Sequence, residues 1–243
     1  MMRTFWQDVR YAVRMLVKNP ATTVVAIIAL ALGIGANTAI FSVVNAVLLS
    51  PLPYQDPDRL VRLSEDSPQV PEMSISYPNF LDWREQNKVF TGIAATQFRS
   101  LNLIGDGEPE RLAGRAVSAE FFDVLGVRPA MGRSFTPEED RPGANRVCII
   151  SHGLWQRRFG SDQKIIGREL NLSGEPYNVI GVLSASYRFG APTDAFVPIG
   201  VRADQMMERG SHPGIYAIAR LKPGVTVEGA RIELVSLAER ISQ

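Results

Sequence analysis

The chain has 243 residues and a formal net charge of +1, from 26 Lys and Arg against 25 Asp and Glu. Nucleic-acid-binding proteins normally carry a strong excess of basic residues, so this balance argues against a nucleic-acid partner. The single cysteine, Cys148, excludes an intrachain disulfide, and its place in the apolar run 147–150 predicts burial as a small hydrophobic residue. Any folded domain in this chain must therefore be stabilised by its own core.

Residues 1–20 predict an amphipathic, basic helix. Apolar side chains that include Phe5 and Trp6 recur at helical spacing, while Arg10 and Arg14 lie elsewhere on the helical wheel. Such a helix lies along a membrane surface, and its positive charge places it on the cytoplasmic side. It either docks a cytoplasmic partner or stiffens the anchor, or it simply supplies the positive flank of a membrane anchor. The residues do not separate these alternatives.

The next segment, 21–49, predicts a transmembrane helix. No charged side chain occurs between Lys18 and Asp56, and the segment is almost continuously apolar. A membrane span needs about 20 such residues. A cleaved secretory signal has an apolar stretch of only about 7–15 residues, so the length favours an uncleaved anchor. We expect the chain to lie in the inner membrane, with its N-terminus cytoplasmic and its main domain periplasmic.

Small and polar residues are arranged in rows along this predicted span. One row holds Ala29, Gly33 and Asn37, and an opposed row holds Ala31, Gly35 and Ala39. Rows of small residues at this spacing let helices approach closely in lipid. Asn37 shares its face with Asn45, and polar side chains at membrane depth normally point into a helix bundle. The pattern favours packing of the span against further helices.

Beyond the span, alternating apolar residues, glycine turns and helix-capping residues predict a mixed α+β domain. The expected strands are 60–63, 111–117, 146–150, 169–172, 177–183, 195–199 and 215–221. The expected helices are 78–86, a short one capped by Ser118 and ended by Gly126, one with a capping box at 136–139, one from Ser151 to Gly160, and one from 227 to the last residue. Because this last pattern runs to the end without a cap, we expect the chain to be part of a longer protein.

The motifs of catalysis are missing. The sequence contains no phosphate-binding G-x-x-x-x-G-K-[ST] loop and no G-x-S-x-G nucleophile elbow. Neither His152 nor His212 has a second ligand at metal-binding spacing. The acidic run 138–140 is explained by the charge preference of a helix N-terminus. We therefore expect no enzymatic activity, no metal and no cofactor.

Several segments resemble one family when they are taken together. They are 5–12 (FWQDVRYA), 32–42 (LGIGANTAIFS), 121–127 (FFDVLGV), 132–135 (GRSF), 154–160 (LWQRRFG) and 177–182 (YNVIGV). They are similar to the N-terminus and the periplasmic core domain of MacB/FtsX-type ABC transporter permeases, especially the duplicated orphan permeases of acidobacteria. The resemblance covers essentially the whole chain.

The resemblance implies an architecture and a role. A porter-like periplasmic lobe would comprise 52–128 and 213–243, and an inserted second lobe would comprise 129–212. The chain would be the N-terminal part of a permease that relays the motion of a cytoplasmic ATPase to the periplasmic domain, for export or extraction of substrate. Its partners would be the ABC ATPase subunit, the remaining permease helices or a second permease half, and a periplasmic adaptor. The alternative is a single-span periplasmic sensor or assembly scaffold.

Overall fold

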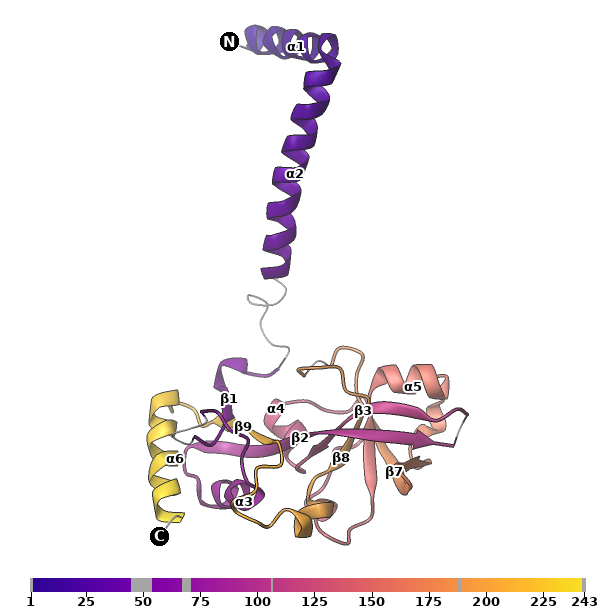
Figure 1. The fold of residues 1–243 in the computed structure, drawn as a ribbon, viewed down its shortest axis with the longest axis vertical. Coiled ribbons are helices and arrows are strands. Elements are labelled where there is room, and N and C mark those ends of the chain that lie inside the picture. The colour runs from indigo at the N-terminus through magenta and orange to yellow at the C-terminus, as the bar shows by residue number, and fades with distance from the viewer. Residues whose placement is uncertain (1, 45–53, 67–70, 106, 188, 242–243) are drawn as a thin grey trace. The chain divides into compact units, whose positions relative to one another are not determined.

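The computed structural model describes residues 2–44, 54–66, 71–105, 107–187 and 189–241. The chain divides into two compact units, Met1–Leu52 and Pro53–Gln243. The first unit consists of helices, and the second contains the strands together with short helices (Figure 1). This mixture confirms the predicted α+β class with one apolar N-terminal helix.

The first unit contains α1 (Met2–Lys18) and α2 (Pro20–Val44). Only Asn19 separates them, and the Thr23 hydroxyl donates to the carbonyl oxygens of Leu16 at 2.7 Å and of Asn19 at 2.9 Å. Proline is well accepted at the first position of a helix, because the missing N–H would have no partner there. The junction therefore joins two helices through local hydrogen bonds.

The stretch Pro20–Ser42 is long and apolar enough to cross a membrane, with a mean hydropathy of 2.3. It coincides with most of the predicted span 21–49. The end of that span, including Asn45, lies outside the described residues.

The second unit, here called the sheet unit, contains nine strands among its described residues. They are β1 (Leu60–Leu63), β2 (Phe90–Ile104), β3 (Glu110–Val117), β4 (Met131–Gly132), β5 (Val147–Ile150), β6 (Glu169–Leu172), β7 (Glu175–Val182), β8 (Ala195–Pro198) and β9 (Ile215–Leu221). Its helices are α3 (Tyr77–Gln86), α4 (Phe121–Leu125), α5 (His152–Phe159) and α6 (Val227–Ile241), with 3₁₀ turns η2 (Pro57–Arg59), η3 (Gln163–Ile165) and η4 (Gly200–Gln205).

The strands pair in the order β1-β9-β2-β3-β8-β5-β7-β4. The β3–β8 and β5–β7 pairs are parallel, and the other pairs are antiparallel. In addition, β6 pairs with both β7 and the end of β2. The strands β2, β3, β8, β5, β7 and β6 therefore pair in a closed ring, and β9 and β1 extend the sheet from β2.

The long strand β2 was not expected from the sequence. Its middle residues Ile93, Ala94, Ala95 and Thr96 are all buried, so both faces of the strand are covered there. A strand that is buried on both faces shows no alternation of apolar and polar residues, and that alternation is the main signal of a strand. This strand pairs with β3, β6 and β9. The strand that was not predicted is therefore the one that connects much of the sheet.

Two helix predictions were wrong in detail. The segment 136–139 forms a turn rather than a helix, although the Glu139 carboxylate accepts from the Thr136 N–H at 3.0 Å, as in a capping box. Ser118 does not cap α4, because its hydroxyl accepts from the Ala95 N–H of β2 at 3.0 Å. At 136–139 the capping-box contact forms without a helix, and at Ser118 the capping residue makes a different contact.

Other local predictions are confirmed. The Ser151 hydroxyl accepts from the Leu154 N–H at 3.1 Å and caps α5, which ends at Gly160 in a left-handed conformation. The β6–β7 hairpin turns at Ser173 and Gly174, both with positive φ. Two-residue hairpin loops favour this conformation because it matches the twist of the strands.

The core of the sheet unit lies on both faces of the strands. One cluster packs beneath α3, α5 and α6 and includes Phe80, Trp83, Trp155 and Leu237. The other contains the aromatic side chains of Phe121, Phe122, Phe135 and Phe196. Cys148 is fully buried, as predicted, and burial raises the pKa of its thiol to about 12.

The predicted boundary between two lobes, near residue 128, falls inside the sheet unit. Strands from both sides of it pair directly, β3 with β8 and β2 with β6. The division into 52–128 plus 213–243 and 129–212 stays a prediction.

Candidate functional site

The predicted packing residues of the span lie on α2. Ala29, Ala31, Gly33, Gly35, Asn37 and Ala39 are all exposed in this unit. A Cβ atom added at Gly33 or Gly35 would meet no other atom within 4 Å. Both rows are therefore open to neighbours, and their role in helix packing stays a prediction.

The predicted surface residues lie on α1. The side chains of Trp6, Arg10 and Arg14 are exposed, with 69% of Trp6 accessible. Phe5 belongs to the same helix. An exposed indole ring beside arginines is the composition expected of a helix at a membrane interface.

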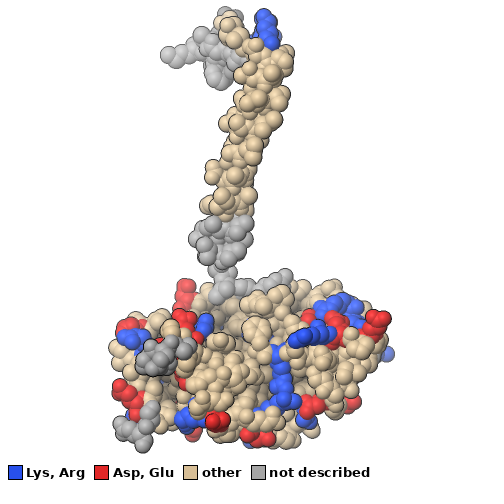
Figure 2. Space-filling view, in the orientation of Figure 1, with Lys and Arg blue, Asp and Glu red and all other residues tan. Residues whose placement is uncertain are grey.

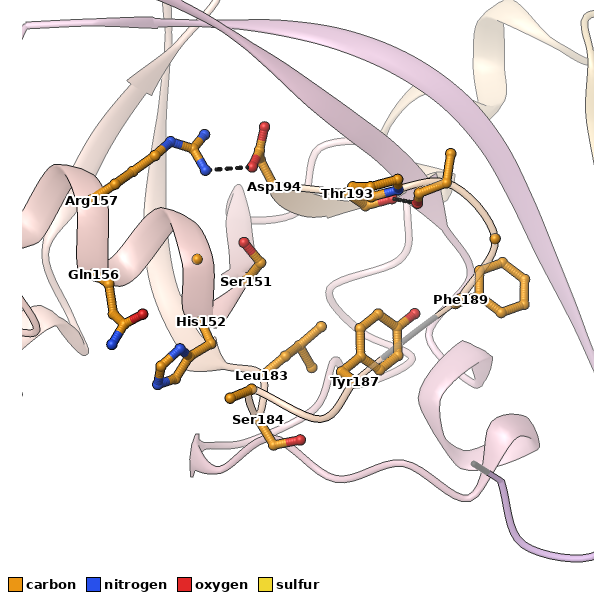
Figure 3. Close-up of a pocket in the computed structure, with 15 residues that line it drawn as sticks. Ser151, His152, Gln156, Arg157, Leu183, Ser184, Tyr187, Phe189, Thr193 and Asp194 are labelled. Atoms are coloured by element: carbon orange, nitrogen blue, oxygen red, sulfur yellow. Dashed lines mark hydrogen bonds and ion pairs between the residues drawn. The ribbon is translucent and has the colours of Figure 1, made fainter. Parts of the chain in front are cut away.

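The sheet unit contains a cavity of about 600 Å³ between the start of α5 and the segment that leads into β8. Ser151, His152, Gln156 and Arg157 line one side (Figure 3). The other side is formed by residues that include Leu183, Ser184, Tyr187, Phe189, Thr193 and Asp194. The lining is mostly apolar, with the charged groups at one end.

Arg157 and Asp194 hold that end of the cavity together. The Arg157 guanidinium donates to an Asp194 carboxylate oxygen at 2.9 Å and to Glu110 at 2.7 Å. The second oxygen of Asp194 accepts from the Ala113 N–H of β3 at 3.1 Å. These contacts join α5, β3 and the start of β8, so both carboxylates are engaged in structural pairing.

The cavity does not assemble a catalytic triad. Ser151 already accepts the capping hydrogen bond of α5, and Asp194 is bound to Arg157. Within the described residues, the backbone N–H of Ser151 donates to the Asp194 carbonyl oxygen at 2.8 Å, but no hydrogen bond joins the side chains of Ser151, His152 and Asp194. The His152 ring points away from the other two side chains (Figure 3). Nucleophilic catalysis needs nucleophile and base within hydrogen-bonding distance, so this arrangement offers none.

A buried arginine supports the far wall of this cavity. Arg115 is only 5% exposed, and its guanidinium stacks on Phe98 at 3.9 Å and on Phe189 at 5.1 Å. It donates to the hydroxyls of Thr96 and Thr193, each at 3.2 Å. Burial lowers the pKa of Arg115. Arg115 thus connects β2 and β3 to the segment that lines the cavity.

The acidic run 138–140 lies in a turn and not at the helix N-terminus that was predicted, and two of its carboxylates make local contacts. Glu139 makes a bidentate ion pair with Arg133, whose two terminal nitrogens lie 2.6 and 2.8 Å from the two carboxylate oxygens. Asp140 accepts from the N–H groups of Ala119 and Gly200 at 3.0 and 2.5 Å. Across the described parts of the chain, no group of three or more His, Cys, Asp or Glu side chains could hold a metal ion.

Comparison with known protein families identifies the family of this chain. The model of the MacB-like periplasmic core domain matches residues 23–237, which include most of α2 and nearly all of the sheet unit. The chain belongs to the MacB-like periplasmic core domain family. Comparison with curated proteins found no match.

Solved structures share the MacB-like fold. The periplasmic region of MacB from Actinobacillus actinomycetemcomitans is 16% identical, with a TM-score of 0.58 over 75% of this chain and 82% of that one. A domain assigned to a permease from Porphyromonas gingivalis is 18% identical, with a TM-score of 0.61 over 77% and 86%. The extracellular domain of the noncanonic ABC-type transporter YknZ from Gram-positive bacteria is 16% identical, with a TM-score of 0.54 over 76% and 94%.

The sheet unit is therefore homologous to the periplasmic domains of MacB-like ABC transporter permeases. The sequence motifs predicted this family, but neither the role of Arg115 nor the cavity. Arg115 lies in a strand that was predicted, yet only the pairing with β2 and β8 brings Phe98 and Thr193 to it. No local pattern could have signalled that contact.

Proposed function

We propose that this chain is the N-terminal part of an ABC transporter permease, which relays the motion of a cytoplasmic ATPase to a periplasmic domain. The relayed motion would export substrate or extract it from the membrane. The observation that carries the proposal is the family match over residues 23–237, because it joins the apolar helix and the sheet unit in one homologous block.

The first unit would be the transmitting element. A helix of 25 residues, the length of α2, is about 37 Å long and spans the apolar layer of a membrane. The exposed rows through Gly33 and Gly35 would pack against the remaining permease helices or a second permease half. Asn37 and Asn45 would face into that bundle, where a polar side chain finds a partner.

The proposed topology is argued from charge. The basic helix α1, with Arg10 and Arg14, would lie on the cytoplasmic surface of the inner membrane, and the sheet unit would be periplasmic. ATP hydrolysis would belong to the separate ATPase subunit, because this sequence has no phosphate-binding loop. A periplasmic adaptor is the third proposed partner.

Single cysteines test the topology in intact cells. The native Cys148 is buried, so it leaves a low labelling background. With a membrane-impermeant maleimide, we expect Lys222→Cys to react once the outer membrane is permeabilised. Arg10→Cys should react only after the inner membrane is also opened. The reverse order would contradict the proposed orientation.

ATPase coupling tests the transmission. The full permease that contains this chain, reconstituted with its ATPase in nanodiscs, should hydrolyse ATP faster than the ATPase alone. Trp6→Ala on the apolar side of α1 should lower this stimulation, whereas Tyr11→Ala on another side of the same helix should retain it. A failure of every candidate ATPase to be stimulated would instead favour a sensor or scaffold.

A further inference from the structure

Tyr177 on β7 is surrounded by charged side chains whose charges do not cancel. Its ring is buried, with 6% exposed, and the charges that act on its hydroxyl belong to Arg99, Arg146, Arg202 and Glu175. They come from β2, the residue before β5, η4 and the start of β7. The β2–β6 and β6–β7 pairings place the second half of β2, which holds Arg99, beside the hairpin that holds Glu175 and Tyr177. The fold thus gathers three guanidinium groups and one carboxylate from four separate segments.

The single carboxylate is shared. A Glu175 oxygen lies 2.9 Å from Arg146 Nη2, and the other oxygen lies 3.9 Å from Arg202 Nη2. The Tyr177 hydroxyl also donates to Glu175, at 3.4 Å. Three positive charges against one negative charge leave an excess of two.

The excess is not relieved by other partners in the described part of the chain. Within that part, the guanidinium of Arg99 makes no hydrogen bond and no ion pair, although its backbone pairs with β3. The Nε of Arg146 is buried without an acceptor. Burial lowers the pKa of Arg99, and the like charge of Arg202 lowers it further. Such a group of cations is stabilised when an anion binds.

The group is open to a ligand from solvent. The side chains of Arg146 and Arg202 are 38% and 39% exposed, and Arg99 is half-buried. None of the three lines the cavity of Figure 3. On the face of the sheet unit seen in Figure 2, basic side chains gather in a band.

We propose that Arg99, Arg146 and Arg202 form a binding site for a phosphate group, either of a free phosphate or of a lipid headgroup. The planar guanidinium fork matches the oxygens of phosphate and binds them with two parallel hydrogen bonds. The excess of two positive charges equals the charge of a phosphate dianion. The site is inferred from the contacts and charges of these side chains and does not depend on the transport function proposed above.

Isothermal titration of the full chain with inorganic phosphate tests the site, in an uncharged maltoside detergent and at constant ionic strength. We expect saturable binding that weakens as salt is raised, because salt screens charges. Arg202→Gln should weaken binding about tenfold, the effect of losing one charge-assisted hydrogen bond. Arg202 is partly exposed, so this change should leave the melting temperature of the chain unchanged.

Two further variants separate this site from a general effect of charge. Glu175→Gln removes the competing carboxylate and should tighten binding about threefold, in line with the energy of a surface ion pair. Arg231→Gln removes the same positive charge as Arg202→Gln, from the fully exposed end of an α6 ion pair, and should leave binding unchanged.

Fluorescent phosphatidic acid in the same micelles, compared with phosphatidylcholine, identifies the source of the phosphate. If inorganic phosphate binds, and the affinities of the variants follow the order given above, the ligand is a free phosphate. Binding of phosphatidic acid alone, with the same order, supports a lipid headgroup. The proposal is overturned if neither probe binds, or if Arg202→Gln binds like the Arg231→Gln control.

Discussion

The helix α2 and the strand β2 show two ways in which a long element is encoded. The helix has 25 residues, is apolar on every side, and makes its hydrogen bonds within its own segment. The strand has 15 residues and makes its hydrogen bonds to three other strands. The composition of α2 is apolar along its length, whereas the burial of β2 changes from complete at Ile93–Thr96 to alternating after Phe98. One element is therefore visible in the sequence and the other is not.

The difference separates local from long-range determinants. A transmembrane segment can be predicted from sequence because the lipid around it favours apolar residues at every position. The residues of a strand inside a closed ring must fit the neighbouring strands, and those strands come from distant segments of the chain. Stability should then respond strongly to side chains in the sheet unit and weakly to exposed ones on α2.

The largest effect should come from the aromatic core. Phe122 is fully buried against Phe135, Tyr187 and Phe196, so Phe122→Ala should lower the free energy of unfolding by about 3–5 kcal/mol. Leu32→Ala on α2, where the side chain is 67% exposed, should change it by less than about 0.5 kcal/mol. Urea unfolding in detergent, followed by tryptophan fluorescence, measures both. Equal losses of stability in the two variants would contradict the expected difference between the sheet unit and α2.

Gly200 tests a close approach that only the fold creates. A Cβ atom there would lie 2.1 Å from the Asp140 carbonyl oxygen, so Gly200→Ala should destabilise the sheet unit by about 2–3 kcal/mol. Gly153 in α5 offers the matched control, because its Cβ would meet no atom closer than 3.8 Å. Gly153→Ala should stabilise by about 0.5–1 kcal/mol through helix propensity. A loss of stability in both variants would show that the Asp140 contact is not the cause.

Arg115 sharpens the comparison, because it is a charged residue that acts as part of the core. Arg115→Ala should lower the free energy of unfolding by about 2 kcal/mol through loss of hydrogen bonds and ring stacking. Hydrogen exchange should also become faster at the amides of Phe189 and Gly190. The exposed Arg231→Ala should have no measurable effect on either observable. Unchanged exchange in the Arg115 variant would contradict its role as a link to the cavity wall.

The smallest effect concerns the Glu139–Arg133 ion pair. The hydrogen bond from Arg133 holds the pKa of Glu139 below its usual value. The stability from this pair is therefore complete above the ordinary glutamate pKa of about 4.3, and is lost as pH falls through the lower folded-state pKa. Glu139→Gln should lower the unfolding free energy by about 1 kcal/mol at pH 7.

The difference between the wild-type chain and the Glu139→Gln variant should shrink as the pH is lowered towards 3. Urea unfolding at a series of pH values measures it. The neighbouring Asp140, whose burial raises its pKa, is present in both chains, so its opposite pH dependence is removed in the comparison. A difference that stays constant with pH would contradict the assignment to Glu139.

Parts of the sheet unit could be predicted because their signals are local. Ser151 and Gly160 bound α5, and Ser173 and Gly174 turn the β6–β7 hairpin, with only their immediate neighbours involved. The same kind of signal failed at Ser118, whose hydroxyl contacts the backbone of β2 instead of capping a helix. A capping residue has the same local appearance in both cases, and the tertiary contact decides between them.

The sequence by itself determined the apolar span, the basic flank before it, the α+β composition and the family. The first three depend on residue type over a short window, where hydrophobicity and backbone propensity act directly, whereas the family resemblance depends on several motifs along the chain. The tertiary structure alone decided the closed ring of strands, the burial of Arg115 and the convergence of Arg99, Arg146 and Arg202 around Tyr177. Those features depend on pairings between distant segments. The free energy of such a pairing depends on both segments together, so neither segment predicts it alone.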